Sequence, residues 1–311
     1  MTNTTAVSAR GLTKRYGDNT VLDSVDFDIP TNTICGLFGR NGAGKTTLMS
    51  ILTAQNFATA GDARIFGEDP YENPGVLSRI CFVRESQKYP DDARPSHAFA
   101  AAKLFFPNWD DDLATRLIDE FRLPCKTRIK KLSRGQLSAV GVIIGLASRA
   151  EITFFDEPYL GLDAVARQIF YDRLLADYAE HPRTVVLSSH LIDEISDLIE
   201  RVLVVDDGSI VLDEDADDLR GRAVTVIGAE SAVDEFVAGR EELHRERLGS
   251  VASATVLGAL DVADLRRIDE LNLNTAPVSL QELIVRFTQH ADTTRTTPGA
   301  PSRAHAKGAL R

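Results

Sequence analysis

The sequence predicts an α/β fold whose main sheet is largely parallel and carries helices on its faces. The apolar run at residues 34–38 breaks into a glycine-rich loop and then into apolar residues at helical spacing through Leu52. From residue 152 to residue 205, short apolar runs alternate with segments of helical spacing. Asp207-Gly208 lies between two apolar runs and is a hairpin signal, so an antiparallel strand is expected to close this sheet.

An antiparallel β subdomain is expected at the N-terminus. Residues 7–12 and 21–29 show strand-like alternation, with Val25 and Phe27 on one face of the second segment. The sequence Tyr-Gly-Asp-Asn between the two strands supplies turn chemistry. Tyr16 therefore lies at a loop tip ahead of the glycine-rich loop, where a tyrosine by itself is more often a packing residue than a ligand contact.

The glycine-rich loop has the spacing of a P-loop and stands between a strand and a helix. It consists of Gly39, Arg40, Asn41, Gly42, Ala43, Gly44, Lys45, Thr46 and Thr47. Its glycines allow successive backbone N–H groups to turn inward around a polyphosphate, and the following helix points its N-terminus at the same charge. Lys45 is expected to reach the β- and γ-phosphates, and the Thr46 hydroxyl to bind Mg²⁺. A plain strand-to-helix turn would need neither the lysine nor the threonine.

A helical subdomain is expected at about residues 86–148. Residues 96–106 and 110–121 have helical spacing, and the second of these helices has an acidic start. Helical spacing already explains the burial of the aromatic residues in this region, which favours a small helical core over a ligand-stacking site. These aromatic residues are Phe105, Phe106 and Trp109.

Two carboxylates, Asp156 and Glu157, follow an apolar strand at residues 152–155. A nucleotide hydrolase places such a pair opposite its P-loop, with one carboxylate for the Mg²⁺ shell and one to orient and deprotonate water. Asp-Glu-Pro is also a good strand-end turn, so the pair alone is ambiguous. The order of the motifs favours the interpretation of this pair as part of a nucleotide hydrolase site. The P-loop is followed by Leu-Ser-Arg-Gly-Gln at 132–136, then the carboxylates, then Gly-Leu-Asp at 161–163, then His190.

Composition excludes several classes of protein. The chain has 311 residues, of which 43% are hydrophobic and 26% charged, as in ordinary globular proteins. Its formal net charge of −11 argues against non-specific nucleic-acid binding, which requires clustered Lys and Arg. Cys35, Cys81 and Cys125 are widely spaced, so buried reduced thiols are expected. The longest apolar stretch is too short to span a bilayer and the N-terminus lacks a secretory signal, so a cytosolic chain is expected.

A domain boundary is expected near Arg220. Residues 221–290 contain three short apolar runs, at 224–227, 251–257 and 271–273, with helical segments between and after them. This pattern predicts a small accessory α+β domain. Residues 291–311 have no apolar periodicity and cannot bury enough surface to order themselves, so a disordered tail is expected.

With these motifs in this order, the sequence resembles the ATP-binding-cassette (ABC) ATPases over roughly residues 5–220. The resemblance implies a P-loop NTPase core, ATP and Mg²⁺ as ligands, and ATP hydrolysis. It also implies that Tyr16 stacks on adenine and that residues 39–47 form the Walker A loop. Asp156 and Glu157 then end the Walker B strand, with Glu157 as the general base.

The resemblance further implies a site shared between two subunits. The signature residues Ser133, Gly135 and Gln136 would bind the γ-phosphate of ATP held by a second ABC subunit, because the N-terminus of the signature helix is an anion site. Asp163 resembles the D-loop aspartate that couples the two sites. His190 resembles the switch histidine at the γ-phosphate.

One stretch departs from the family pattern. Where the family usually has Gln after the strand at residues 80–83, this chain has Arg84-Glu85-Ser86-Gln87. Either Glu85 takes the Q-loop place, as in some exporter ATPases, or Gln87 does so after a two-residue shift. Spacing favours Glu85, which then joins Thr46 and Asp156 as a candidate Mg²⁺ ligand.

Residues 106–110, 156–167 and 279–283 resemble bacterial exporter ATPases that pair with separate membrane subunits. This implies a protein at the cytoplasmic face of the membrane, held there by transmembrane permease subunits and paired with a second ABC subunit, with no nucleic acid expected. A membrane subunit, and not this chain, would select the substrate. The alternatives are a soluble ABC protein acting on DNA or the ribosome, and a nucleotide switch without turnover. The first would carry coiled coils, zinc modules or a second cassette, and the second would lack Glu157 or His190.

Overall fold

The computed structural model describes residues 5–85 and 87–285, so the tail predicted for residues 291–311 lies outside the described residues. The chain divides into two compact units, one up to Leu219 and one from Arg220 onward. None of the described helices combines the length and apolar character needed to cross a bilayer.

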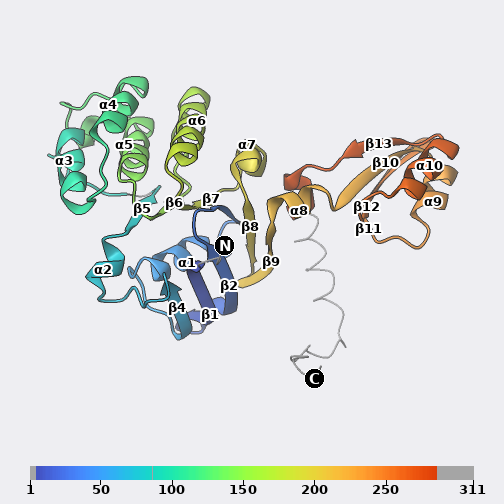
Figure 1. Cartoon of the computed structure of the whole chain (residues 1–311), viewed down its shortest axis with the longest axis horizontal. Coiled ribbons are helices and arrows are strands. Elements are labelled where there is room, and N and C mark those ends of the chain that lie inside the picture. The colour runs from blue at the N-terminus through green and yellow to red at the C-terminus, as the bar shows by residue number, and fades with distance from the viewer. Residues whose placement is uncertain (1–4, 86, 286–311) are drawn as a thin grey trace. The chain divides into compact units, whose positions relative to one another are not determined.

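The main sheet of the first unit has six strands in the order β5-β6-β7-β3-β8-β9 (Figure 1). In this order they are β5 (Ile80–Arg84), β6 (Ile152–Asp156), β7 (Thr184–Ser188), β3 (Ile34–Phe38), β8 (Arg201–Asp206) and β9 (Ser209–Asp215). All neighbouring strands are parallel except β8 and β9. β3, β6 and β7 are buried along their whole length, as parallel strands covered on both faces should be. The predicted α/β fold with a largely parallel sheet is confirmed.

A second, antiparallel sheet in this unit has the strand order β2-β1-β4. Its strands are β1 (Thr5–Tyr16), β2 (Asn19–Pro30) and β4 (Ala60–Ile65). β1 continues beyond the alternating segment 7–12 to Tyr16, and its register with β2 shifts between Ala9 and Leu12 and again between Leu12 and Lys14. Such bulges break the period-two pattern that sequence reading relies on. One apolar core joins both sheets to α1 (Lys45–Leu52).

The helical segment contains α3 (Pro95–Phe105), α4 (Asp111–Glu120) and α5 (Arg134–Ala147). α4 begins where Asp110 accepts a hydrogen bond from the Leu113 N–H at 2.8 Å. α5 packs closely on the sheet at Gly145, where the lack of a side chain leaves room for the Phe155 ring. A Cβ at this position would lie 2.4 Å from that ring. The helical core predicted for the aromatic residues includes Trp109, whose ring packs near Phe99. It does not include Phe105, which is 73% exposed at the end of α3.

Further helices connect the strands of the first unit or follow them. α2 (Pro74–Leu77) precedes β5, α6 (Ala164–Glu180) joins β6 to β7, and α8 (Ala216–Arg220) follows β9. Between β7 and β8, where the sequence has helical spacing, the chain forms only the short α7 (Ile192–Ile195) and a 3₁₀ turn at Ser196–Leu198. Ser196 bonds through its hydroxyl to the Asp193 carbonyl, a local bond of the kind that competes with helix continuation.

The second unit is a four-stranded antiparallel sheet in the order β11-β12-β10-β13, with α9 and α10 in the same unit (Figure 1). In chain order it contains β10 (Ala223–Ala229), α9 (Glu230–Val237), β11 (Glu242–Leu248), β12 (Val251–Leu257), α10 (Val262–Glu270) and β13 (Asn274–Pro277). This is the split βαβ arrangement. The sequence did not reveal β11, because this edge strand is rich in charged residues. The apolar run at 271–273 lies just before β13, and Leu273 packs into the core of this unit.

Candidate functional site

The glycine-rich loop between β3 and α1 has backbone positions that only glycine fits well. Gly39 has a φ of 149°, and a Cβ there would lie 2.2 Å from the Val205 carbonyl oxygen. Gly44, the N-cap of α1, has a φ of 112°, and its Cβ would lie 2.9 Å from the Val21 carbonyl oxygen. No described side chain caps α1, and its first turn holds no acidic residue. The first N–H groups of α1 can therefore bind an anion.

Lys45, the first residue of α1, is buried, and its ammonium group lies across the loop. Nζ donates hydrogen bonds to the carbonyl oxygens of Gly39 at 2.8 Å and Arg40 at 3.3 Å. It lies 3.8 Å from Oε1 of Glu157. Burial lowers the pKa of Lys45, and the nearby carboxylates of Glu157 and Asp156 oppose that change. The loop therefore holds a desolvated cation at the place where a polyphosphate would enter.

Asp156 ends β6 and is tied to two neighbouring segments through hydroxyl groups. Thr46 Oγ1 donates to its Oδ2 at 2.8 Å, and Ser188 Oγ donates to its Oδ1 at 2.9 Å. Ser188 Oγ also accepts a bond from the Glu157 N–H at 3.0 Å. Asp156 is only 6% exposed, so these bonds fix both of its oxygens at the carboxyl edge of the sheet.

Glu157 lies just past the end of β6 with a φ of 49°. A positive φ at a non-glycine residue costs on the order of 1–3 kcal/mol and recurs at functional sites. Its Oε2 lies 3.2 Å from Nδ1 of His190, which follows β7. The Tyr159 hydroxyl contacts the same Nδ1 at 2.9 Å. A carboxylate and an imidazole from two strands therefore meet beside Lys45.

A cavity of about 370 Å³ opens at this edge, and the P-loop and both carboxylates line it. Glu85, just after β5, also lines it, and its N–H donates to the Asp156 carbonyl at 3.0 Å. Gln87 does not line the cavity. The Glu85 side chain forms an ion pair with Arg134. Of the two residues considered for the Q-loop place, the structure brings Glu85 to the site.

The signature residues do not line this cavity. Ser133 is the N-cap of α5: its hydroxyl accepts from the Gln136 N–H at 3.2 Å, and Gln136 Oε1 accepts from the Ser133 N–H at 3.0 Å. A Cβ at Gly135 would lie 2.6 Å from the Gly161 carbonyl oxygen. Asp163 caps α6 through a 2.8 Å bond from the Ala166 N–H. The structure thus places these four residues at two helix starts, apart from the P-loop.

Tyr16 lies at the end of the hairpin formed by β1 and β2. The residue is 50% exposed, and its hydroxyl accepts a hydrogen bond from the Asn56 amide. The Lys14 ammonium lies 4.7 Å from the ring centroid. Tyr16 does not line the cavity of the P-loop, so its ring is a separate, open platform.

Sequence reasoning missed two residues of this site, Ser188 and Tyr159. Ser188 orders Asp156, and Tyr159 contacts the His190 ring. Both follow or end buried strands at the edge that carries the P-loop. Polar side chains at strand ends on that edge are the signal that could have identified them.

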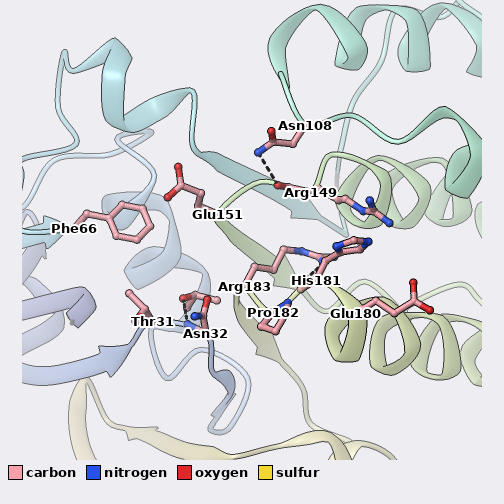
Figure 2. A pocket seen from close by; sticks show the side chains of 11 residues that line it. Thr31, Asn32, Phe66, Asn108, Arg149, Glu151, Glu180, His181, Pro182 and Arg183 are labelled. Carbon is pink, nitrogen blue, oxygen red and sulfur yellow. Dashed lines mark hydrogen bonds between the residues drawn. The ribbon is translucent and has the colours of Figure 1, made fainter. Parts of the chain in front are cut away.

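A larger pocket, of about 790 Å³, lies at the opposite edge of the main sheet, where β6 and β7 begin (Figure 2). Three of its charged side chains are paired: Arg149 and Arg183 with Asp177 at 3.0 and 2.6 Å, and Glu151 with Arg79 at 2.7 Å. It contains none of the residues predicted from the motifs. Of the two cavities, only the smaller one is lined by the P-loop and the two carboxylates.

Comparison with known proteins identifies this arrangement. The family described as ABC transporter matches residues 22–160. A doxorubicin resistance ATP-binding protein of Mycobacterium tuberculosis is 29% identical, over 89% of this chain and 90% of that protein. An uncharacterized ABC transporter ATP-binding protein of Methanocaldococcus jannaschii is 30% identical, over 66% of this chain and 76% of that protein.

A solved structure, a dimeric post-hydrolysis ATP-binding cassette bound to ADP and Pi, shares the fold with a TM-score of 0.59 and 20% identity. It matches 68% of this chain and 98% of that one. The fold and the site together define a P-loop ATPase. The chain belongs to the family of ABC transporter ATP-binding proteins, and it is the ATP-binding and ATP-hydrolysing subunit of such a transporter. The family resemblance of the motifs is confirmed.

Proposed function

We propose that this chain is one of two cassettes that close on ATP and Mg²⁺ and so drive export through separate transmembrane permease subunits. The observation that carries the proposal is the cavity of the P-loop, which contains Thr46, Asp156 and Glu157 but none of the signature residues. A second cassette would complete such a site. Residues 1–220 are the ATP-binding domain in this proposal, with a helical subdomain at about 86–148, and residues 221–290 are an accessory domain.

ATP binding begins at the P-loop. The free N–H groups of α1 and the Lys45 ammonium face the same small volume, so they neutralise the β- and γ-phosphates together. The exposed ring of Tyr16 offers a flat surface for adenine. Glycines at positions 39 and 44 keep the backbone close enough for these bonds.

Thr46 and Asp156 would hold the Mg²⁺ that accompanies ATP, with Glu85 on the same wall of the cavity. These residues fit Mg²⁺, which prefers oxygen ligands, because Thr46 Oγ1 and Asp156 Oδ2 lie 2.8 Å apart. The other acidic side chains that line the cavity, Glu85 and Glu157, are also oxygen ligands. When bound, the ion supplies charge neutralisation at the phosphates. Ser188 keeps Asp156 oriented for this role through the second carboxylate oxygen.

Hydrolysis uses Glu157 and His190. Glu157 lies 3.8 Å from Lys45 Nζ, so its carboxylate stands at the end of the phosphate site where an attacking water would be. Glu157 orients this water and takes its proton, while Lys45 balances the charge on the phosphate oxygens. His190, 3.2 Å from Glu157, contacts the γ-phosphate.

The second cassette contributes its signature and D-loop residues. Ser133, Gly135 and Gln136 form the start of α5, a 14-residue helix whose N-terminus suits an anion. Asp163 starts α6, and the segment before it contacts Gly135 within the same chain. The signature and the D-loop therefore move as one body toward the partner's ATP.

Export is favoured over the soluble alternatives on DNA or the ribosome because the relatives described above are ABC transporter and drug-resistance ATP-binding proteins. The cassette is then peripheral, at the cytoplasmic face of the membrane, and is held there by its permease subunits. The permease selects the substrate, and drug-like small molecules are the class to test first, given the doxorubicin resistance relative.

Light scattering on a non-hydrolysing variant tests this proposal. Glu157→Gln should form a dimer that depends on ATP, because the partner's signature closes on an intact nucleotide. Adding Ser133→Asp keeps a good helix cap but places a negative charge beside the γ-phosphate, so the dimer should be lost while ATP binding persists. A tagged chain should also co-purify with a membrane permease after mild detergent extraction. A fully active monomer, or a protein found only in the soluble fraction, would contradict the proposal.

A further inference from the structure

The Tyr159 side chain lies behind His190 and is only 2% exposed. It belongs to the segment between β6 and α6, whereas His190 follows β7. Three polar atoms surround its hydroxyl oxygen: Nδ1 of His190 at 2.9 Å, the His190 backbone N–H at 3.0 Å and Oγ of Ser189 at 3.2 Å. The two rings lie 5.6 Å apart between centroids. The position of the imidazole therefore depends on this tyrosine.

The hydrogen atoms available around the Tyr159 hydroxyl determine which group donates in each of its hydrogen bonds. The His190 backbone N–H and the Ser189 O–H both donate to the Tyr159 oxygen, which fills the two acceptor positions of a phenol. Ser189 Oγ is itself an acceptor from the Leu191 N–H at 2.8 Å, so its own hydrogen is free to point at the tyrosine. The phenolic hydrogen then has one partner left, Nδ1 of His190.

We propose that Tyr159 is a positioning residue that holds His190 in the tautomer with a bare Nδ1 and a proton on Nε2. In a neutral imidazole, a nitrogen that accepts a hydrogen bond leaves the proton on the other nitrogen. Within the described residues, Nε2 of His190 makes no hydrogen bond, so this N–H is available to a ligand. The inference rests on the proposed contact of His190 with the γ-phosphate.

The assignment matters for Glu157 as well. Glu157 Oε2 lies 3.2 Å from the same Nδ1, close enough to accept a hydrogen bond if that nitrogen carried the proton. Such a bond would occupy the carboxylate that must accept the proton of water. By donating to Nδ1, Tyr159 leaves Glu157 Oε2 free of a bond from the ring and keeps the only N–H of the ring on Nε2.

Tyr159→Phe in the full chain tests this inference, because it keeps the ring and removes only the hydroxyl. ¹⁵N-histidine NMR of the nucleotide-free protein at about pH 8, above the ordinary histidine pKa of about 6.5, reports the tautomer. The His190 resonances are assigned by their absence from His190→Gln. The control is Tyr171→Phe, a second buried tyrosine, whose hydroxyl lies 3.5 Å from Glu194 and contacts neither His190 nor Ser189.

We expect the Nε2–H pattern for His190 in the unaltered protein and in Tyr171→Phe, and a mixture or the Nδ1–H pattern in Tyr159→Phe. The kcat of Tyr159→Phe should fall about tenfold while the KM for ATP stays within about twofold, the signature of an interaction used in the transition state. An unchanged tautomer or an unchanged kcat in a folded Tyr159→Phe protein would overturn the inference. Full ATPase activity in His190→Ala would instead overturn the proposed role of His190.

Discussion

Thr46 and Asp156 are 110 residues apart in the sequence, yet Thr46 Oγ1 lies 2.8 Å from Asp156 Oδ2. Thr46 follows β3 and Asp156 ends β6, and β7 separates the two strands in the parallel sheet. Because parallel strands end at the same edge, the sheet brings these two oxygens together.

The first prediction concerns this pair and Mg²⁺. Asp156→Asn puts an amide where two hydroxyl groups, those of Thr46 and Ser188, now donate, and it removes a charge from the metal site. We expect ATP hydrolysis to fall by a factor of about 10² or more and the half-saturating Mg²⁺ concentration to rise. Removing Mg²⁺ with EDTA should abolish hydrolysis by the unaltered protein. Asp172→Asn, on the exposed face of α6, is the control, and a normal Mg²⁺ titration of Asp156→Asn would refute the assignment.

The second prediction separates catalysis from binding. Glu157→Gln should keep ATP binding and lose turnover by a factor of about 10² or more, because the amide cannot take a proton from water. Lys45→Ala should instead weaken ATP binding, since it removes the cation that faces the phosphates. Isothermal titration and a phosphate-release assay distinguish the two outcomes. Glu151→Gln, at the opposite end of β6, should behave like the unaltered protein, whereas near-normal turnover by Glu157→Gln would end this assignment.

The third prediction concerns the contact between the signature helix and the D-loop. Alanine at a helical glycine usually stabilises by about 0.5–1 kcal/mol. At Gly135 the new Cβ would lie 2.6 Å from the Gly161 carbonyl oxygen, and overpacking costs about 1–3 kcal/mol, so the clash wins. Urea unfolding should show a net loss of stability, and the ATP-dependent dimer should weaken. Gly221→Ala, with no atom within 4 Å of its Cβ, is the control. An equal stability for both variants would show that the contact is not tight.

The fourth prediction concerns the three thiols and pH. Burial raises the pKa of both Cys35 and Cys81 from 9.0 to about 12, whereas Cys125 is only partly buried. At pH 8 a thiol reagent should therefore label Cys125 rapidly and the other two only after unfolding. Above pH 9 the unfolded chain releases protons that the native thiols retain, so stability should fall as pH rises from 9 toward 12. Unfolding of Cys81→Ala measured across this range should show a shallower slope, and rapid native labelling of all three thiols would contradict the burial.

The fifth prediction concerns the membrane partner. Phe105 is an exposed aromatic residue at the end of α3, and we propose that the helical segment containing α3 contacts the permease. If it docks there, Phe105→Ala should weaken co-purification with the permease by about 1–3 kcal/mol, the usual scale of an aromatic hot spot, and leave ATP binding unchanged. Phe57→Ala, also an exposed aromatic at 59%, is the control. Unchanged association of Phe105→Ala in a protein that is folded by circular dichroism would exclude Phe105 from the interface.

The sequence alone determined the parts of this protein that depend on local spacing. The P-loop at residues 39–47, the carboxylates Asp156 and Glu157, and the signature at 132–136 are each short patterns whose residue types chemistry dictates. The largely parallel sheet followed from the alternation of apolar strands with helical segments. Each of these patterns involves residues that are close to one another along the chain, so it can be recognised without coordinates.

Only the tertiary structure decided what depends on the pairing of distant strands. It brought Ser188 to Asp156 and Tyr159 to His190, it brought Glu85 and not Gln87 to the cavity, and it left Phe105 in solvent. It also revealed β11, whose charged residues suit a sheet edge and give no apolar signal. These contacts arise because strand order and register set which residues, 30 or more positions apart, meet at one edge of a sheet, and no local pattern encodes that meeting.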